Sequence, residues 1–195
     1  MKNLKIATLA VVVIFSYLTT QAQGTMNQKT DDKSTVMVGG EAMYPMKNIV
    51  ENAVNSKAHT TLVTAVKAAG LVETLQSAGP FTVFAPVNDA FENLPAGTVE
   101  TLVKPENKKT LASILTYHVV SGRYDFRELS DLIKKGNGSA SLKTVSGGTL
   151  TFMMNGPRNI SVRDENGSVA NVTTYDVYQS NGVIHSVDSV LLPKS

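Results

Sequence analysis

The chemistry of the turns changes part-way along the chain, and this change constrains the fold more than any other feature. The pair Asn-Gly occurs at residues 137, 155, 166 and 181 and nowhere earlier. Both residues readily adopt the positive φ angles of tight hairpin turns. Short β-branched or alternating runs lie around these turns, at 141–145, 149–153, 160–163, 169–175 and 183–192. The chain beyond residue 119 is therefore predicted to form antiparallel hairpins.

The residues before 119 follow a helical period instead. Apolar residues recur there every three to four positions until Gly79-Pro80 ends the pattern: Ile49, Ala53, Val54, Leu62, Ala65, Val66 and Ala69. After it we predict a strand over 81–85, a short helix capped by Asn88 or Asp89, and helices over 98–103, from Pro105 to His118, and over 126–135. Helices first and hairpins second is typical of an α+β domain.

The N-terminus is predicted to be a targeting segment rather than part of the fold. Lys2 and Lys5 precede an apolar run over 6–15, and small residues at 20–22 suit a cleavage site. We therefore predict a signal peptide over 1–22, with an uncleaved membrane anchor as the alternative. The polar residues that follow predict a flexible leader over 23–45, and 46–193 are predicted to be one domain.

Composition and charge exclude several functions. The chain has no cysteine, which excludes disulfides, thiolate metal sites and a cysteine nucleophile. Its formal net charge of +2 comes from Lys2 and Lys5, so the cleaved chain is neutral and has no basic field to hold nucleic acid. We expect a secreted or periplasmic protein without a stable membrane span after cleavage.

The three histidines suit no common catalytic or metal site. The chain lacks G-x-S-x-G, phosphate-loop motifs and the histidine spacings of metal sites, so we expect no cofactor and no metal. In the segment His185-Ser186-Val187-Asp188, strand neighbours point to opposite faces, so His185 and Ser186 should diverge. A hydrolase that uses His118 or His185 stays an alternative.

Tyr117-His118 follows an apolar helix and is expected to lie in or near the core. A buried imidazole without a partner costs ~1–3 kcal/mol. We predict that His118 forms a hydrogen bond with the turn at 88–89, the other polar site flanked by apolar runs.

Three segments together resemble a fasciclin domain. Residues 79–91 read GPFTVFAPVNDAF, residues 115–120 read LTYHVV, and residues 181–193 read NGVIHSVDSVLLP. Their order and separation match the conserved blocks of that family. The resemblance extends from about residue 48 to residue 193.

The resemblance implies a fasciclin-like β-wedge or sandwich of antiparallel hairpins, with the helical N-terminal half packed against it. It also implies a non-catalytic adhesion or binding module that acts outside the cell on a surface protein or a polysaccharide. In animal members the Tyr-His segment and the last block are linked to integrin binding. The residues that carry the candidate structural or binding motif are Asn88, Asp89, Tyr117, His118, His185 and Asp188.

A periplasmic small-ligand carrier or stress protein is the main alternative to adhesion. It would need a pocket between sheet and helices, for which we predict a lining of Phe81, Phe84, Phe91 and Met153. The sequence indicates neither the partner nor the oligomeric state.

Overall fold

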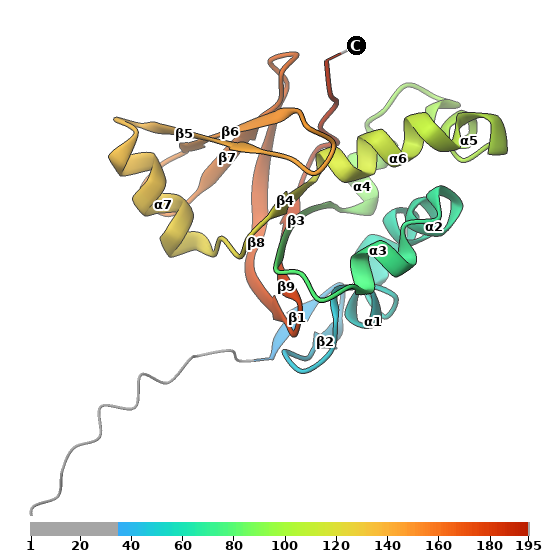
Figure 1. The fold of residues 1–195 in the computed structure, drawn as a ribbon, viewed down its shortest axis with the longest axis horizontal. Coiled ribbons are helices and arrows are strands. Elements are labelled where there is room, and N and C mark those ends of the chain that lie inside the picture. The colour runs from blue at the N-terminus through green and yellow to red at the C-terminus, as the bar shows by residue number, and fades with distance from the viewer. Residues whose placement is uncertain (1–34, 195) are drawn as a thin grey trace, which may run out of the picture. The chain divides into compact units, whose positions relative to one another are not determined.

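The fold is taken from a computed structural model, which describes residues 35–194. The predicted signal peptide and residues 23–34 of the predicted leader lie outside this range. The elements, shown in Figure 1, are β1 (Val36–Val38), β2 (Glu41–Met43), α1 (Ile49–Ala53), η1 (Lys57–His59), α2 (Thr60–Ala69), α3 (Val72–Gln76), β3 (Phe81–Pro86), α4 (Asn88–Glu92), α5 (Thr98–Leu102), η2 (Pro105–Asn107), α6 (Lys108–Tyr117), β4 (Val119–Ser121), α7 (Phe126–Lys135), β5 (Ser139–Lys143), β6 (Thr149–Met154), β7 (Ile160–Arg163), β8 (Val169–Gln179) and β9 (Gly182–Val187).

Within the described residues, seven strands form one sheet in the order β4-β3-β9-β8-β7-β6-β5. The strands β5 to β9 pair antiparallel in sequence order, as the hairpin signals predicted. The strands β3 and β9 pair in parallel, which the sequence pattern did not predict. The sheet nearly closes on itself, because the Val145 N–H after β5 donates to the Val119 carbonyl of β4 at 2.7 Å. The result is the predicted α+β architecture.

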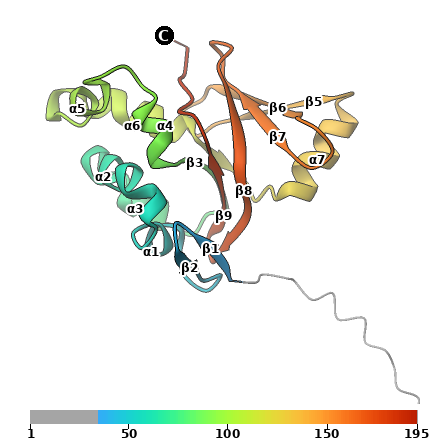
Figure 2. The same ribbon diagram turned by 180° about the vertical axis from the view of Figure 1, so that it is seen from behind.

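The helices cover the sheet unequally. In Figures 1 and 2, α1 to α6 lie on one side of the strands, and α7 lies by itself on the other side, beside β5 and β6. Helix α7 has the predicted bounds because its start is well defined. Asp125 accepts from the Glu128 N–H, and the Glu128 carboxylate accepts from the Asp125 N–H, which is a complete capping box.

One Asn-Gly pair serves a different turn from the other three. The pairs at 155, 166 and 181 connect neighbouring antiparallel strands, whereas Asn137-Gly138 ends α7. Asn137 and Gly138 have φ angles of 53° and 105°. The Gly138 N–H donates to the Ile133 carbonyl at 2.9 Å, so this pair closes a helix C-terminus.

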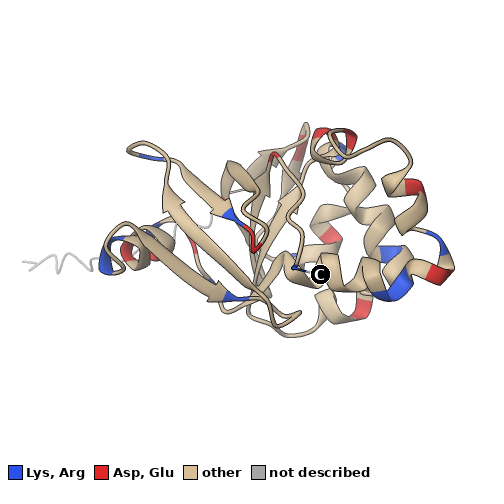
Figure 3. Cartoon of the chain, turned by 90° about the horizontal axis from the view of Figure 1, so that it is seen from above, with Lys and Arg blue, Asp and Glu red and all other residues tan. Residues whose placement is uncertain are grey.

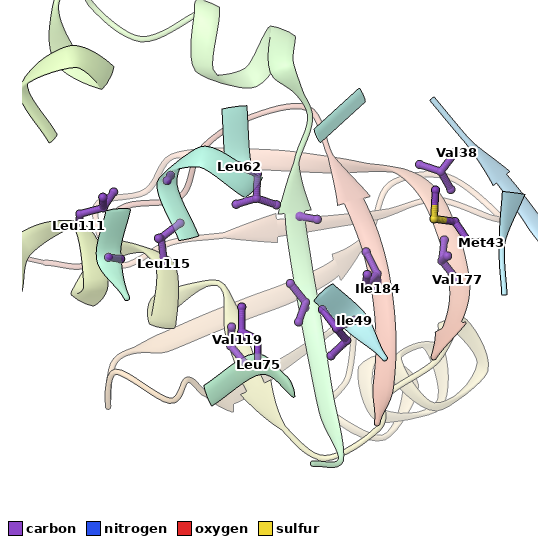
Figure 4. Close-up of a cluster of buried hydrophobic side chains, with 14 residues drawn as sticks. Val38, Met43, Ile49, Leu62, Leu75, Leu111, Leu115, Val119, Val177 and Ile184 are labelled. Atoms are coloured by element: carbon purple, nitrogen blue, oxygen red, sulfur yellow. The ribbon is translucent and has the colours of Figure 1, made fainter. Parts of the chain in front are cut away.

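The sheet separates two hydrophobic cores. The helix-side core, drawn in Figure 4, packs helices α1, α2, α3 and α6 and the hairpin β1–β2 against β3 and β9; it includes Val38, Met43, Ile49, Leu62, Leu75, Leu115, Val119 and Ile184. The strand-side core packs α7 and the end of α6 against β5 to β9; it includes Tyr117, Leu129, Ile133, Leu150, Phe152, Ile160, Val162 and Val187.

Residues 36–43 depart from the predicted flexible leader. They form the hairpin β1–β2, in which Gly39 and Gly40 supply the turn with φ angles of 61° and 79°. Val38 and Met43 are buried in the helix-side core. The sequence pattern did not indicate this hairpin, because its few apolar residues stand among polar ones. The burial of two side chains offsets the entropy lost on ordering it.

Asn181, in the turn between β8 and β9, joins the helices to the sheet. Its side-chain oxygen accepts from the Ile49 N–H at 3.0 Å, and its amide donates to the carbonyls of Leu75 and Ser77, both at 2.8 Å. One buried side chain therefore holds the start of α1 and the end of α3 against the last hairpin.

Candidate functional site

His118 is buried at the end of α6, and both of its ring nitrogens bond to backbone groups. Nε2 lies 3.0 Å from the Leu191 nitrogen, whose N–H must donate, so Nδ1 carries the proton and donates to the Ile114 carbonyl at 2.9 Å. Burial lowers the pKa of His118 to about 4, so the ring is neutral at pH 7. The predicted bond to the turn at 88–89 is wrong, because the C-terminal segment after β9 reaches the ring instead.

Tyr117 points away from His118 into the strand-side core. The ring is fully buried, and its hydroxyl donates to the Thr149 carbonyl at 2.8 Å and accepts from the Glu165 N–H at 3.1 Å. Tyr117 and His118 thus form separate internal hydrogen bonds on opposite sides of the sheet. Neither side chain is available to a partner at the surface.

Asn88 ties two helical segments together rather than capping its own helix. Its oxygen accepts from the Thr61 N–H at 3.1 Å and the Thr60 hydroxyl at 3.2 Å, and its amide donates to the Lys57 carbonyl at 2.9 Å. The N-cap position of α4 is Val87, so the predicted cap by Asn88 or Asp89 is wrong. Asp89 is exposed in the first turn of α4, where a negative charge is favourable.

His185 lies at the centre of the sheet, fully buried between aromatic rings. It stacks on Phe84 at 5.6 Å, and its Nε2–H donates to the Tyr124 carbonyl at 2.8 Å. Nδ1 accepts from the Asp176 N–H at 3.3 Å and lies 4.0 Å from the Asp176 carboxylate. Burial lowers the pKa of His185 and raises the pKa of Asp176. These bonds position the irregular middle of β8.

Asp188 clamps β8 to the end of β9. Its carboxylate accepts from the Asn171 N–H at 2.7 Å and from the Asn171 side-chain amide at 2.9 Å, and the Asp188 N–H donates back to the Asn171 carbonyl at 3.1 Å. Asp188 is half-buried and fully used by these contacts. The candidate residues are therefore distributed over the fold and do not converge on one site.

His59 and Ser186 form a buried pair that the sequence did not reveal. Ser186 turns to the opposite face from His185, as strand alternation predicted, and its hydroxyl lies 3.2 Å from His59 Nε2. Ser56 lies 2.9 Å from the other ring nitrogen of His59, and burial lowers the pKa of this histidine. The two residues are 127 positions apart, so only the parallel pairing of β3 and β9 beside η1 brings them together.

The helix-side core contains an apolar cavity of about 110 Å³, which we call the helix-side cavity. Of the four residues predicted for a carrier pocket, Phe81 and Phe84 line it. Phe91 instead lines a second apolar cavity of about 220 Å³, the tail-side cavity, between α4 to α6 and the C-terminal segment. Met153 lines neither of these cavities.

Within residues 35–194, no group of three or more His, Asp or Glu side chains is placed to hold a metal ion. None of the helices in this part of the chain is both long and apolar enough to cross a membrane. Lys and Arg residues are interspersed with Asp and Glu in Figure 3, both on α7 and on the helices at the other end of the view. These helices thus carry no surface patch of a single charge sign.

Comparison with known proteins identifies the family. The fasciclin domain model matches residues 57–193. The chain belongs to the fasciclin domain family. It is 44% identical to Protein sll1483 of Synechocystis sp. over 193 residues, which are 95% of this chain and 98% of that protein.

The chain also matches about half of one longer relative and of one longer solved chain. It is 32% identical to the cell surface glycolipoprotein MPB83 of Mycobacterium bovis over 149 residues, 76% of this chain and 56% of that one. Its fold is similar to a FAS1 domain pair from the insect cell adhesion molecule fasciclin I, with a TM-score of 0.66 and 20% identity over 76% of this chain and 51% of that chain. The second likeness establishes the fasciclin fold.

Proposed function

We propose that this fasciclin domain is a secreted or periplasmic, non-catalytic adhesion module that binds a protein at the cell surface. Two relatives support this role, since MPB83 is a cell surface glycolipoprotein and fasciclin I is an insect cell adhesion molecule. The burial of Ser186 and His59, 1% and 4% exposed, supports a structural role for that pair rather than attack on a substrate.

The observation that carries the proposal is a group of three exposed apolar side chains on and just after the hairpin β1–β2, which we call the hairpin patch. Met37 is 63% exposed, Tyr44 46% and Met46 92%, all within ten residues of chain. The Lys47 ammonium lies 4.9 Å from the centre of the Tyr44 ring. Methionine and tyrosine are enriched in protein interfaces, and large exposed apolar groups gathered together mark contact surfaces. The patch favours a protein partner over a polysaccharide.

The hairpin patch replaces the surfaces that the sequence suggested. Tyr117, His118 and His185 are buried, and Asn88 and Asp188 are half-buried and hydrogen-bonded within the fold. The hairpin β1–β2 is held to the body of the domain by Val38 and Met43, while Met37 on the opposite face is exposed. Strand alternation thus anchors one face of the hairpin and presents the other.

The test is retention of beads coated with the purified protein on cells of the producing organism. The triple substitution Met37→Ser, Tyr44→Ser and Met46→Ser should reduce retention at least tenfold, because it removes the apolar contact area. Val169→Ser is the matched control, since Val169 is exposed (41%) on β8. Protease treatment of the cells should also abolish retention. Equal retention of the triple variant and the control would reject the hairpin patch as the contact surface.

Export is tested separately by determining the N-terminus of the protein recovered outside the cytoplasm. Cleavage after Ala22 should leave a chain that begins near Gln23. Recovery of the chain only in the cytoplasm, with Met1 intact, would contradict the secreted or periplasmic location.

A further inference from the structure

The helix-side cavity has walls that suit an apolar guest and do not suit water. Most of its lining comes from aliphatic side chains such as Leu62, Val66, Val119 and Ile184. The histidines in the lining, His59 and His118, already have partners at both ring nitrogens. A buried water needs two to four polar partners, so this cavity offers water little.

The cavity also reaches the surface. Two of its lining residues, Val54 and Val145, are 47% and 43% exposed. Lys67, on the last turn of α2, lines the cavity and is exposed too. It is the lysine among the lining residues, and no carboxylate of residues 35–194 lies within 4.0 Å of its ammonium. Lys67 therefore adds a charged residue to the lining of a mostly apolar cavity.

These features match one kind of ligand, an apolar chain that ends in an anion. We propose that the helix-side cavity binds a free fatty acid, with the terminal part of the acyl chain inside and the carboxylate paired with Lys67. A dry apolar cavity of about 150 Å³ admits benzene in another protein, so a void of about 110 Å³ is of the size that takes the end of an acyl chain. The tail-side cavity has no Lys, Arg, Asp or Glu in its lining and so lacks the second half of this match.

The proposal predicts a dependence on chain length. Each methylene that leaves water strengthens binding by up to about fourfold. The affinity of the protein as isolated for saturated carboxylates of increasing length should rise until the cavity is full and then level off. Calorimetric titration measures this series. The absence of saturable binding by any member would overturn the proposal.

Charge substitutions test the role of Lys67. An exposed ion pair contributes little, so Lys67→Glu should weaken carboxylate binding about three- to tenfold. The matched control is Lys109→Glu, on the exposed surface of α6 and outside the cavity lining, which should bind as the unmodified protein does. The primary alcohol of the same chain length should be indifferent to both changes. Equal weakening by both substitutions would reject the carboxylate site at Lys67.

The position of the acyl chain of the ligand is tested by filling the cavity and by measuring contacts between ligand and protein. Val66→Phe adds a ring to the cavity wall and should abolish binding. Because this variant can fail to fold, nuclear Overhauser contacts are measured in the unmodified protein as well. Ligand methylenes should contact the methyl groups of Leu62 and Val119 and not those of Leu150. Contacts to Leu94 in the tail-side cavity, or to Leu150, would overturn the assignment. None of these outcomes depends on cell adhesion.

Discussion

The two cores of this domain differ in how completely they are filled. Leu150, Phe152, Ile160 and Val162 of the strand-side core are all 0% exposed. In the helix-side core, Leu62, Leu75 and Ile184 are 7–9% exposed and border the helix-side cavity. The strands thus form the solid part of the fold, whereas the short helices leave space between them. We therefore expect a ligand on the less tightly packed side, where moving side chains to admit it costs the least free energy.

The same substitution made in each core tests this contrast, and we expect it to give the largest change in stability. Leu150→Ala should lower the free energy of unfolding by about 4–5 kcal/mol, because it opens a void among well-packed side chains. Leu62→Ala should cost about 2–3 kcal/mol, because part of its surface already faces the cavity. Urea unfolding measures both. Equal losses would show that the two cores are equally well packed.

Acid should weaken the attachment of the C-terminal segment to α6. The pKa of His118 is about 4 in the folded protein against 6.5 for a free side chain, so the unfolded chain binds more protons between these values. The contribution of His118 to the free energy of unfolding is therefore fully present above about pH 6.5. It falls by about 3 kcal/mol as the pH drops toward 4. Burial of His59 and His185 acts in the same direction.

The contribution of His118 is isolated by His118→Gln, whose side chain does not titrate between pH 4 and 6.5. Unfolding free energies measured between pH 7 and 4 should fall less steeply for this variant than for the unmodified protein. Identical slopes for the two proteins would assign the acid sensitivity to other groups.

Asn181→Ala should loosen the helix side while the strand side stays closed. The change removes one acceptor and two donor contacts to α1 and α3, and the expected loss is about 2 kcal/mol. Hydrogen exchange should quicken in those two helices and remain slow in β6 and β7. Uniformly faster exchange would indicate that the two cores unfold as one unit. Asp89→Ala, on the exposed first turn of α4, is the surface control and should change little.

The smallest effect is expected on the hairpin patch. Met37→Ser, Tyr44→Ser and Met46→Ser should each change the unfolding free energy by less than about 0.5 kcal/mol, because these side chains are already exposed. Thermal unfolding measures this. A large loss would mean that the hairpin patch packs against the fold and would remove it as a free contact surface.

Local signals predicted the elements whose ends depend on nearby residues. The period of 3.6 gave α7 its bounds, and the turns at 155, 166 and 181 gave the hairpins their order. The short hairpin at 36–43 was missed, because two buried side chains make too weak a pattern among polar neighbours.

The candidate residues show where local reasoning ends. The sequence indicated that His118 needs a partner, and it has two: the Ile114 carbonyl four residues back and a backbone N–H 73 residues away. Ser186 meets His59 across 127 residues, and no spacing rule relates such positions. Hydrogen-bond chemistry requires that a buried group be satisfied and does not specify by which group.

Local patterns indicated the α+β class, the family and the hairpin turns, because these follow from periodicity and from residues close in the chain. The fold adds that β3 pairs in parallel with β9, that most of the motif residues form hydrogen bonds inside the domain, and that apolar space remains on the helix side. The physical reason is that packing sums contacts between distant segments. Whether their side chains fill the space between them depends on shapes that local patterns do not encode.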